Sequence, residues 1–151
     1  MVKSMSYDGE YANASYLIGL LAISIGGGLS AFLANLPSRH AMWSIAFIVL
    51  VLGVAQILLG RSMLVLKTKL SRNNMLSLIV MFNLACILVL SGVITLVSNL
   101  IIAGTIILLS TLLYHVRLVG WHRGVWGTMY YSIVSLLFIS ASIGMVMSLV
   151  R

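Results

Sequence analysis

The sequence predicts an all-α integral membrane protein built as a bundle of five transmembrane helices. Hydrophobic residues make up 62% of the 151 residues and charged residues only 7%, whereas soluble domains carry about 25% charged residues. The apolar residues fall into five long runs, and the short stretches between them hold almost all of the charge. A helix needs about 20 mostly apolar residues to cross the hydrocarbon of a bilayer. We therefore expect helices at about residues 14–36, 41–66, 75–97, 100–116 and 127–150.

The elements follow from these runs in order. The first run is longer than the ~7–15 residue core of a signal peptide, so we interpret it as a retained helix. The second is interrupted only by Gln56 and Arg61, and the fifth by no charge at all. Between the third and fourth runs no charged residue occurs, and we predict a turn at Ser98 and Asn99, because a single helix through both runs would overrun a bilayer by about 30 Å. A re-entrant or strongly tilted fourth helix is the alternative. With five crossings and short connections, residues 1–151 are expected to form one transmembrane domain.

The distribution of basic residues predicts an orientation. Lys and Arg concentrate in cytoplasmic connections of membrane proteins, and seven of the nine such residues here fall on one predicted side of the membrane. The seven are Lys3, Arg61, Lys67, Lys69, Arg72, Arg117 and Arg123, while Arg39 and Arg151 fall on the other side. We therefore predict a cytoplasmic N-terminus, an external C-terminus and a location in the plasma membrane.

The first helix carries two stripes of small residues. Small side chains at this spacing let two helices approach closely, which favours helix association in lipid. Packing within the bundle needs about one such stripe, so we predict that part of this helix contacts another subunit. Internal packing alone is the alternative. The candidate contact residues are Gly19, Ala22, Gly26, Gly27, Ser30, Ala31 and Ala34.

The connection before the last helix is the most distinctive segment of the chain. It combines two tryptophans, two arginines, one histidine and several glycines at a membrane interface. Aromatic residues and arginine anchor many protein interfaces, and basic residues attract anionic lipid head groups. We predict a partner or lipid contact here, while an aromatic belt with orienting charge explains most of the same residues. The candidate residues are Arg117, Trp121, His122, Arg123 and Trp126.

Among the polar residues within the apolar runs, Gln56, Arg61 and Asn83 stand out. Gln56 and Asn83 are at similar depth, and a hydrogen bond between them would stabilise the bundle by roughly 0.6–2 kcal/mol. Arg61 is close enough to the end of its helix to extend its head group to the interface. We interpret the three as contacts between helices, and a polar contact for a quinone or lipid head group as the alternative.

Catalytic, cofactor and metal sites are not indicated. The only carboxylates, Asp8 and Glu10, precede the first run, whereas proton relays and ion sites place such groups inside the membrane. The predicted topology separates His40 from His115 and His122 by the thickness of the bilayer, so the three cannot form one metal site, and we interpret the latter two as interfacial. The net charge of +7 is explained by basic loops that set the orientation and attract anionic lipids, which we predict as partners. The sequence has no motif for nucleic-acid binding.

Three functional classes remain. The first is a non-catalytic transmembrane subunit of a larger membrane complex, for example a respiratory or other energy-transducing assembly. The second is a small homo-oligomeric transporter or channel, which would align polar residues on one face of several helices. The third is a membrane enzyme acting on lipid or quinone, for which the candidates are His115, His122, Tyr114 and Arg123. We favour them in that order, because neither an aligned polar face nor a convergent acid–base set is evident.

Overall fold

The computed structural model describes residues 7–35 and 38–149, and all regular structure within them is helical. The second span is continuous but changes character, because α2 passes into the π-helical η1 and then into α3. The elements are α1 (Asp8–Phe32), α2 (Arg39–Phe47), η1 (Ile48–Ala55), α3 (Gln56–Val65), α4 (Arg72–Thr95), α5 (Ser98–Val119) and α6 (Val125–Leu149).

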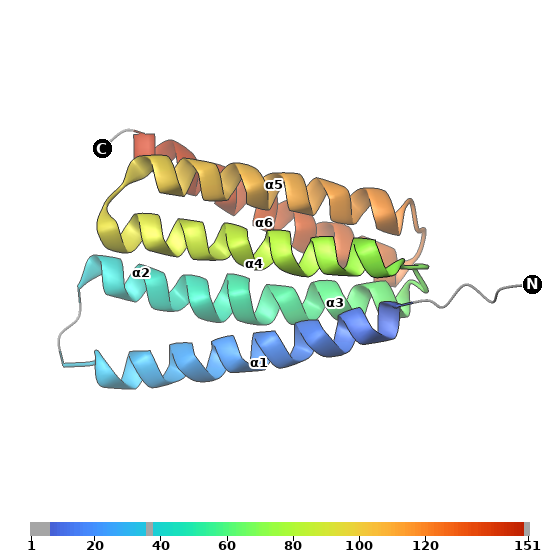
Figure 1. Cartoon of the computed structure of the whole chain (residues 1–151), viewed down its shortest axis with the longest axis horizontal. Helices are drawn as coiled ribbons and strands as arrows, with labels where there is room; N and C mark the ends of the chain where they lie inside the picture. The colour runs from blue at the N-terminus through green and yellow to red at the C-terminus, as the bar shows by residue number, and fades with distance from the viewer. Residues whose placement is uncertain (1–6, 36–37, 150–151) are drawn as a thin grey trace, which may run out of the picture.

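The helices run up and down in an elongated bundle (Figure 1). α1 packs against η1 and α3, α4 pairs most extensively with α5, and α6 lies against α5. Five described helices are long and apolar enough to cross a membrane. The prediction is confirmed in this form: the chain is all-helical and has the features of a multi-pass membrane protein.

The helix ends differ from the predicted ones by a few residues. α1 begins at Asp8, because the polar residues before the first apolar run continue its helix. The predicted turn at Ser98 and Asn99 is wrong by two residues: the chain reverses at Leu96, in the left-handed conformation (φ 58°), and at Val97. α5 then has 22 residues, or about 33 Å, and is long enough to span a bilayer.

Serine and glycine set several of these boundaries. The Ser38 hydroxyl accepts a hydrogen bond from the Ala41 N–H at 3.1 Å, and the Ser71 hydroxyl accepts one from the Asn74 N–H at 3.3 Å. Each satisfies a donor that the first helical turn leaves unpaired. α5 ends at Gly120, whose φ of +67° favours glycine.

Glycines also set the distance between helices. A Cβ on Gly19 would lie 2.5 Å from the Ile57 side chain and 2.8 Å from the Gly53 carbonyl oxygen. In the same contact, a Cβ on Gly60 of α3 would lie 2.6 Å from the Cβ of Ser15 in α1. α1 therefore approaches η1 and α3 as closely as it does because these residues lack larger side chains. We call this contact the α1 inner seam.

Candidate functional site

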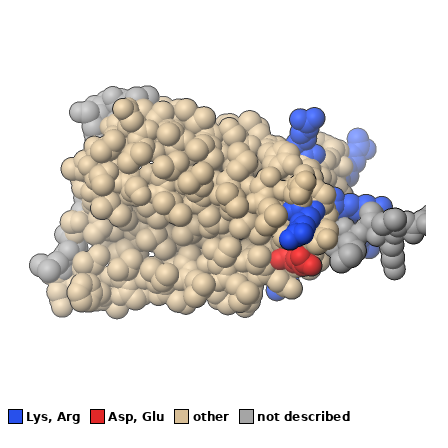
Figure 2. All heavy atoms as spheres, in the orientation of Figure 1, with Lys and Arg blue, Asp and Glu red and all other residues tan. Residues whose placement is uncertain are grey.

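The charged side chains that the structure describes gather at one end of the bundle. On the face shown in Figure 2, Lys and Arg lie at the end where α1 begins, and the rest of that face is almost free of charge. The α3–α4 connection, with Lys67 and Lys69, the first residue of α4, Arg72, and the α5–α6 connection, with Arg123, all lie at this end. Lys3 and Arg151, which entered the orientation prediction, lie outside the described residues.

A buried chain of three rings lies near this end and joins α1, α5 and α6. The Tyr11 hydroxyl lies 3.2 Å from His115 Nε2, and the Tyr130 hydroxyl lies 2.9 Å from His115 Nδ1. All three side chains are buried, with Tyr130 only 1% exposed. Whichever ring nitrogen carries the proton donates to one tyrosine, and the other nitrogen accepts from the second. Both ring nitrogens of His115 are thus hydrogen-bonded, and the cluster links three helices.

The interfacial interpretation of His115 is wrong, since the side chain is 2% exposed and both nitrogens are occupied by tyrosines. Sequence reasoning missed Tyr11 and Tyr130 as its partners. The available signal was weak: two tyrosines and a histidine near the same end of three predicted helices. No group of three His, Cys, Asp or Glu side chains able to hold a metal occurs among the described residues.

An open groove of about 470 Å³ lies between the α5–α6 connection and α6. Tyr131 fixes its wall: its hydroxyl donates to the Gly120 carbonyl and accepts from the His122 N–H at 3.3 Å. Trp121 stacks on the Tyr131 ring, with centroids 5.4 Å apart. Two hydrogen bonds and one stacked ring therefore hold the connection against the first turns of α6, and the groove has a defined shape before any ligand enters.

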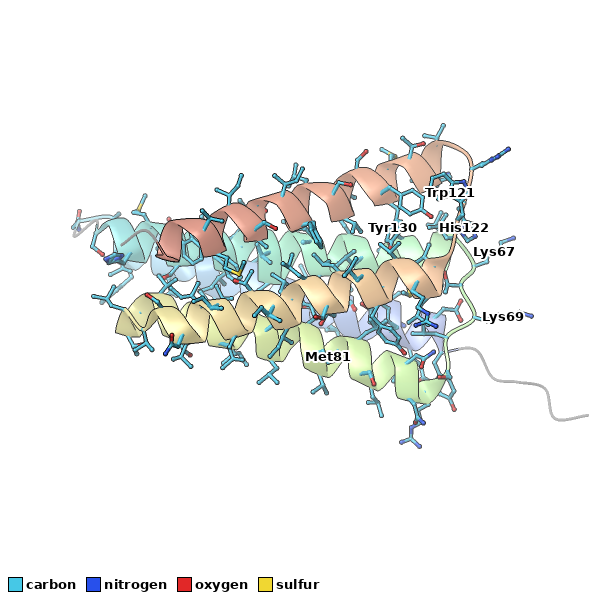
Figure 3. The ribbon with its side chains drawn as sticks, turned by 90° about the horizontal axis from the view of Figure 1, so that it is seen from above. Lys67, Lys69, Met81, Trp121, His122 and Tyr130 are labelled. Atoms are coloured by element: carbon cyan, nitrogen blue, oxygen red, sulfur yellow. The ribbon has the colours of Figure 1, made fainter. Side chains whose placement is uncertain are left out.

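The groove is lined by one cation and several hydrogen-bonding groups. Arg123, His122, Thr128, Ser132 and Ser135 all contribute to it. His122 Nδ1 is shielded from solvent and has no hydrogen-bond partner in the described chain. Figure 3 places Trp121 and His122 at the same end of the bundle as Lys67 and Lys69. Because no carboxylate lines the groove, its electrostatic character is positive.

The other predicted residues of this connection lie outside the groove. Arg117 is exposed in the last turn of α5. Trp126 is 63% exposed in the first turn of α6. Trp121, which does line the groove, is 82% exposed. Large exposed tryptophans at a charged end are typical of a membrane interface.

The small residues of α1 divide between two faces. Gly19, Ala22 and Gly26 are buried in the α1 inner seam, where a Cβ on Gly26 would collide with Val49. The remainder are exposed, and a Cβ on Gly27 or Gly28 would meet nothing within 4 Å. We define the α1 outer face as the exposed small residues Ser24, Gly27, Gly28, Ser30 and Ala31 of α1 together with Ala34, which lies in the turn just after α1.

The three intramembrane polar residues do not meet. Asn83 donates from Nδ2 to the Ile79 carbonyl at 2.8 Å, within its own helix. Gln56 is 3% exposed, and its Oε1 has no hydrogen-bond partner in the described chain. The anticipated Gln56–Asn83 bond is therefore not formed. Arg61 is exposed on α3, with its guanidinium carbon 5.3 Å from the centre of the Tyr16 ring.

The candidate catalytic side chains do not converge either. Tyr114 donates to Asn74 Oδ1 at 2.9 Å, and His115 is enclosed by its two tyrosines. Only His122 and Arg123 share a cavity. The described residues thus form three separate features: a buried polar cluster, a positive groove and an exposed face of small residues.

No family model, curated protein or solved structure matches the chain.

Proposed function

We propose that this protein is a non-catalytic transmembrane subunit of a larger membrane complex, and that the α1 outer face binds a transmembrane helix of another polypeptide. The observation that carries the proposal is the pair Gly27 and Gly28. Both are exposed toward the C-terminal end of a membrane-length helix, with open space where a side chain would stand.

Glycine within a helix is less favourable than alanine by about 0.8–1.0 kcal/mol. In membrane helices this is offset where a second backbone packs closely against the glycine. The glycines of the α1 inner seam have such a neighbour, whereas Gly27 and Gly28 have none within the described chain. A helix that faced only lipid would gain more from larger apolar side chains, such as those at Leu17, Leu21 and Ile25 on other parts of its surface.

The position of α1 supports a lateral partner. α1 packs chiefly against η1 and α3 and lies at one edge of the bundle (Figure 1). Its outer face carries no charged residue, so the occupant we expect is an apolar helix with small residues of its own. A respiratory or other energy-transducing assembly is one example of a complex in which such a subunit would function.

We further propose that the charged end faces the cytoplasm, as the asymmetry of Lys and Arg favours. Asn73 and Asn99 form a matched pair for testing this, since both are exposed asparagines at opposite ends of α4 and α5. In a Cys86→Ala background, an impermeant thiol reagent added to intact cells should label Asn99→Cys and leave Asn73→Cys unlabelled. The reverse pattern would invert the orientation.

Photo-crosslinking tests the subunit role. A photoreactive amino acid at Ala31 or Ser24, on the α1 outer face, should yield a discrete adduct with a second polypeptide in membranes. The matched control is Ile87, which is 57% exposed on α4 and should give no such adduct. Adducts at Ile87 but not at Ala31 and Ser24 would reject this face as the interface. An adduct of exactly twice the chain mass would favour the homo-oligomeric transporter or channel.

A further inference from the structure

We propose that the groove between the α5–α6 connection and α6 binds one anionic phospholipid. The lipid phosphate would occupy the positive groove, and an acyl chain would lie in the hollow beside it. The proposal is independent of the α1 outer face, because no residue of α1 lines either hollow.

The groove offers a phosphate one cation and several hydrogen-bond donors. Arg123 supplies a planar guanidinium, which suits phosphate oxygens well. His122 also lines the groove, and its Nδ1, which is shielded from solvent and unpartnered in the described chain, can donate once the ring turns toward the phosphate. Ser132 and Ser135 line the same space and add two hydroxyl groups, whereas the Thr128 hydroxyl already donates to the Gly124 carbonyl at 3.1 Å.

The neighbouring hollow explains why the occupant is a lipid and not a free phosphate ion. It measures about 500 Å³, and its distinctive walls are the apolar side chains of Val125, Met129 and Ile133. Thr128 and Ser132 line both hollows, so a polar site and an apolar site share one edge. A phosphate ion would leave the apolar hollow unused, while an amphiphile with an anionic head group matches both.

The groove also lies where a head group would be. Trp121 is 82% exposed beside it, and exposed tryptophans favour the level of the head groups. The positive end of the α6 helix dipole points toward the same region. Tyr131 holds the connection in place, so binding does not require the loop to become ordered, a step that would otherwise weaken affinity.

Native mass spectrometry of the purified full chain tests the proposal, with phosphatidylglycerol and phosphatidylcholine supplied at equal concentration. We expect one phosphatidylglycerol to be retained in preference to phosphatidylcholine. Arg123→Gln should weaken its binding about fivefold, because one basic residue contributes about 1 kcal/mol near an anionic lipid. Arg117→Gln is the matched control: it removes the same charge from the adjoining last turn of α5 but lies outside the groove, and we expect less than a twofold effect.

A second variant separates shape from charge. Ser132 is exposed, so Ser132→Phe should fill the shared edge of both hollows without disturbing the core, and should weaken binding at least fivefold. Protection of the Cys86 thiol, which is fully buried, verifies that each variant is folded.

Equal losses of lipid binding in Arg117→Gln and Arg123→Gln would overturn the site, since general charge would then explain binding. Displacement of the lipid by millimolar glycerol phosphate would show that the phosphate group suffices and would overturn the assignment to a lipid. Failure of the unmodified chain to retain phosphatidylglycerol, with an intact α1 crosslink, would refute this proposal and leave the subunit role standing.

Discussion

Gly26 and Gly27 are neighbours in the sequence but have opposite environments in the bundle. Gly26 is buried against Val49 of η1, and there is no room for a Cβ; Gly27 is exposed, and a Cβ there would meet nothing within 4 Å. An α-helix has 3.6 residues per turn, so adjacent residues lie about 100° apart. The comparison separates two uses of glycine in α1: the inner glycines set the distance to the second span, and the outer glycines leave a smooth surface that the described chain does not cover.

The largest expected effect on stability is that of a substitution at Gly26, in the α1 inner seam. Gly26→Leu should destabilise the fold by about 2–3 kcal/mol, because the new side chain has no space and must push α1 away from η1. The measurement is the thermal midpoint at which Cys86, the single cysteine, becomes reactive toward a thiol dye in detergent. An unchanged midpoint would mean that α1 does not pack against η1 as described.

An intermediate effect is expected at the buried ring cluster. His115→Leu removes both hydrogen bonds and leaves the Tyr11 and Tyr130 hydroxyls unpaired, which should destabilise the bundle by roughly 2 kcal/mol. Tyr130→Phe removes only one of the two bonds and should have about half that effect. The same Cys86 assay compares them. If Tyr130→Phe lowered stability as much as His115→Leu, the number of hydrogen bonds made by His115 would not explain the loss of stability, and packing around the Tyr130 ring would.

The smallest effect on stability is expected on the outer side. Gly27→Leu should leave the Cys86 midpoint unchanged or slightly higher, because leucine favours helix more than glycine by up to about 1 kcal/mol and the added side chain meets open space. A midpoint lowered as far as that of Gly26→Leu would contradict the placement of the two faces.

The number and approximate extent of the helices could be predicted from the sequence, because hydrophobic runs of membrane-spanning length are visible in the order of residues without any knowledge of packing. The turn between α4 and α5 was misplaced because Leu96 adopts a left-handed conformation that glycine or asparagine normally signals. The division of the α1 small residues was not predictable either. Two stripes at helical spacing indicate close packing, but which stripe faces inward depends on how α1 is rotated against η1 and α3.

The polar contacts were still less accessible to sequence reasoning. His115 lies near the end of a predicted helix, which suggested an interfacial residue. Only the packing of α1, α5 and α6 places it between Tyr11 and Tyr130. Similarly, Gln56 and Asn83 have matching depths but point elsewhere. Depth along a helix follows from residue number, whereas the direction of a side chain around the helix requires the packing of neighbours.

The most direct test of the central claim is recovery of the assembled complex from membranes containing Gly27→Leu and Gly28→Leu, each normalised to the amount of inserted chain. The account predicts normal insertion, an unchanged Cys86 midpoint and recovery of the co-purifying polypeptide reduced at least fivefold, because leucine would separate the two helices at their closest approach. Full recovery with both variants would contradict the α1 outer face as the site where this protein binds its partner.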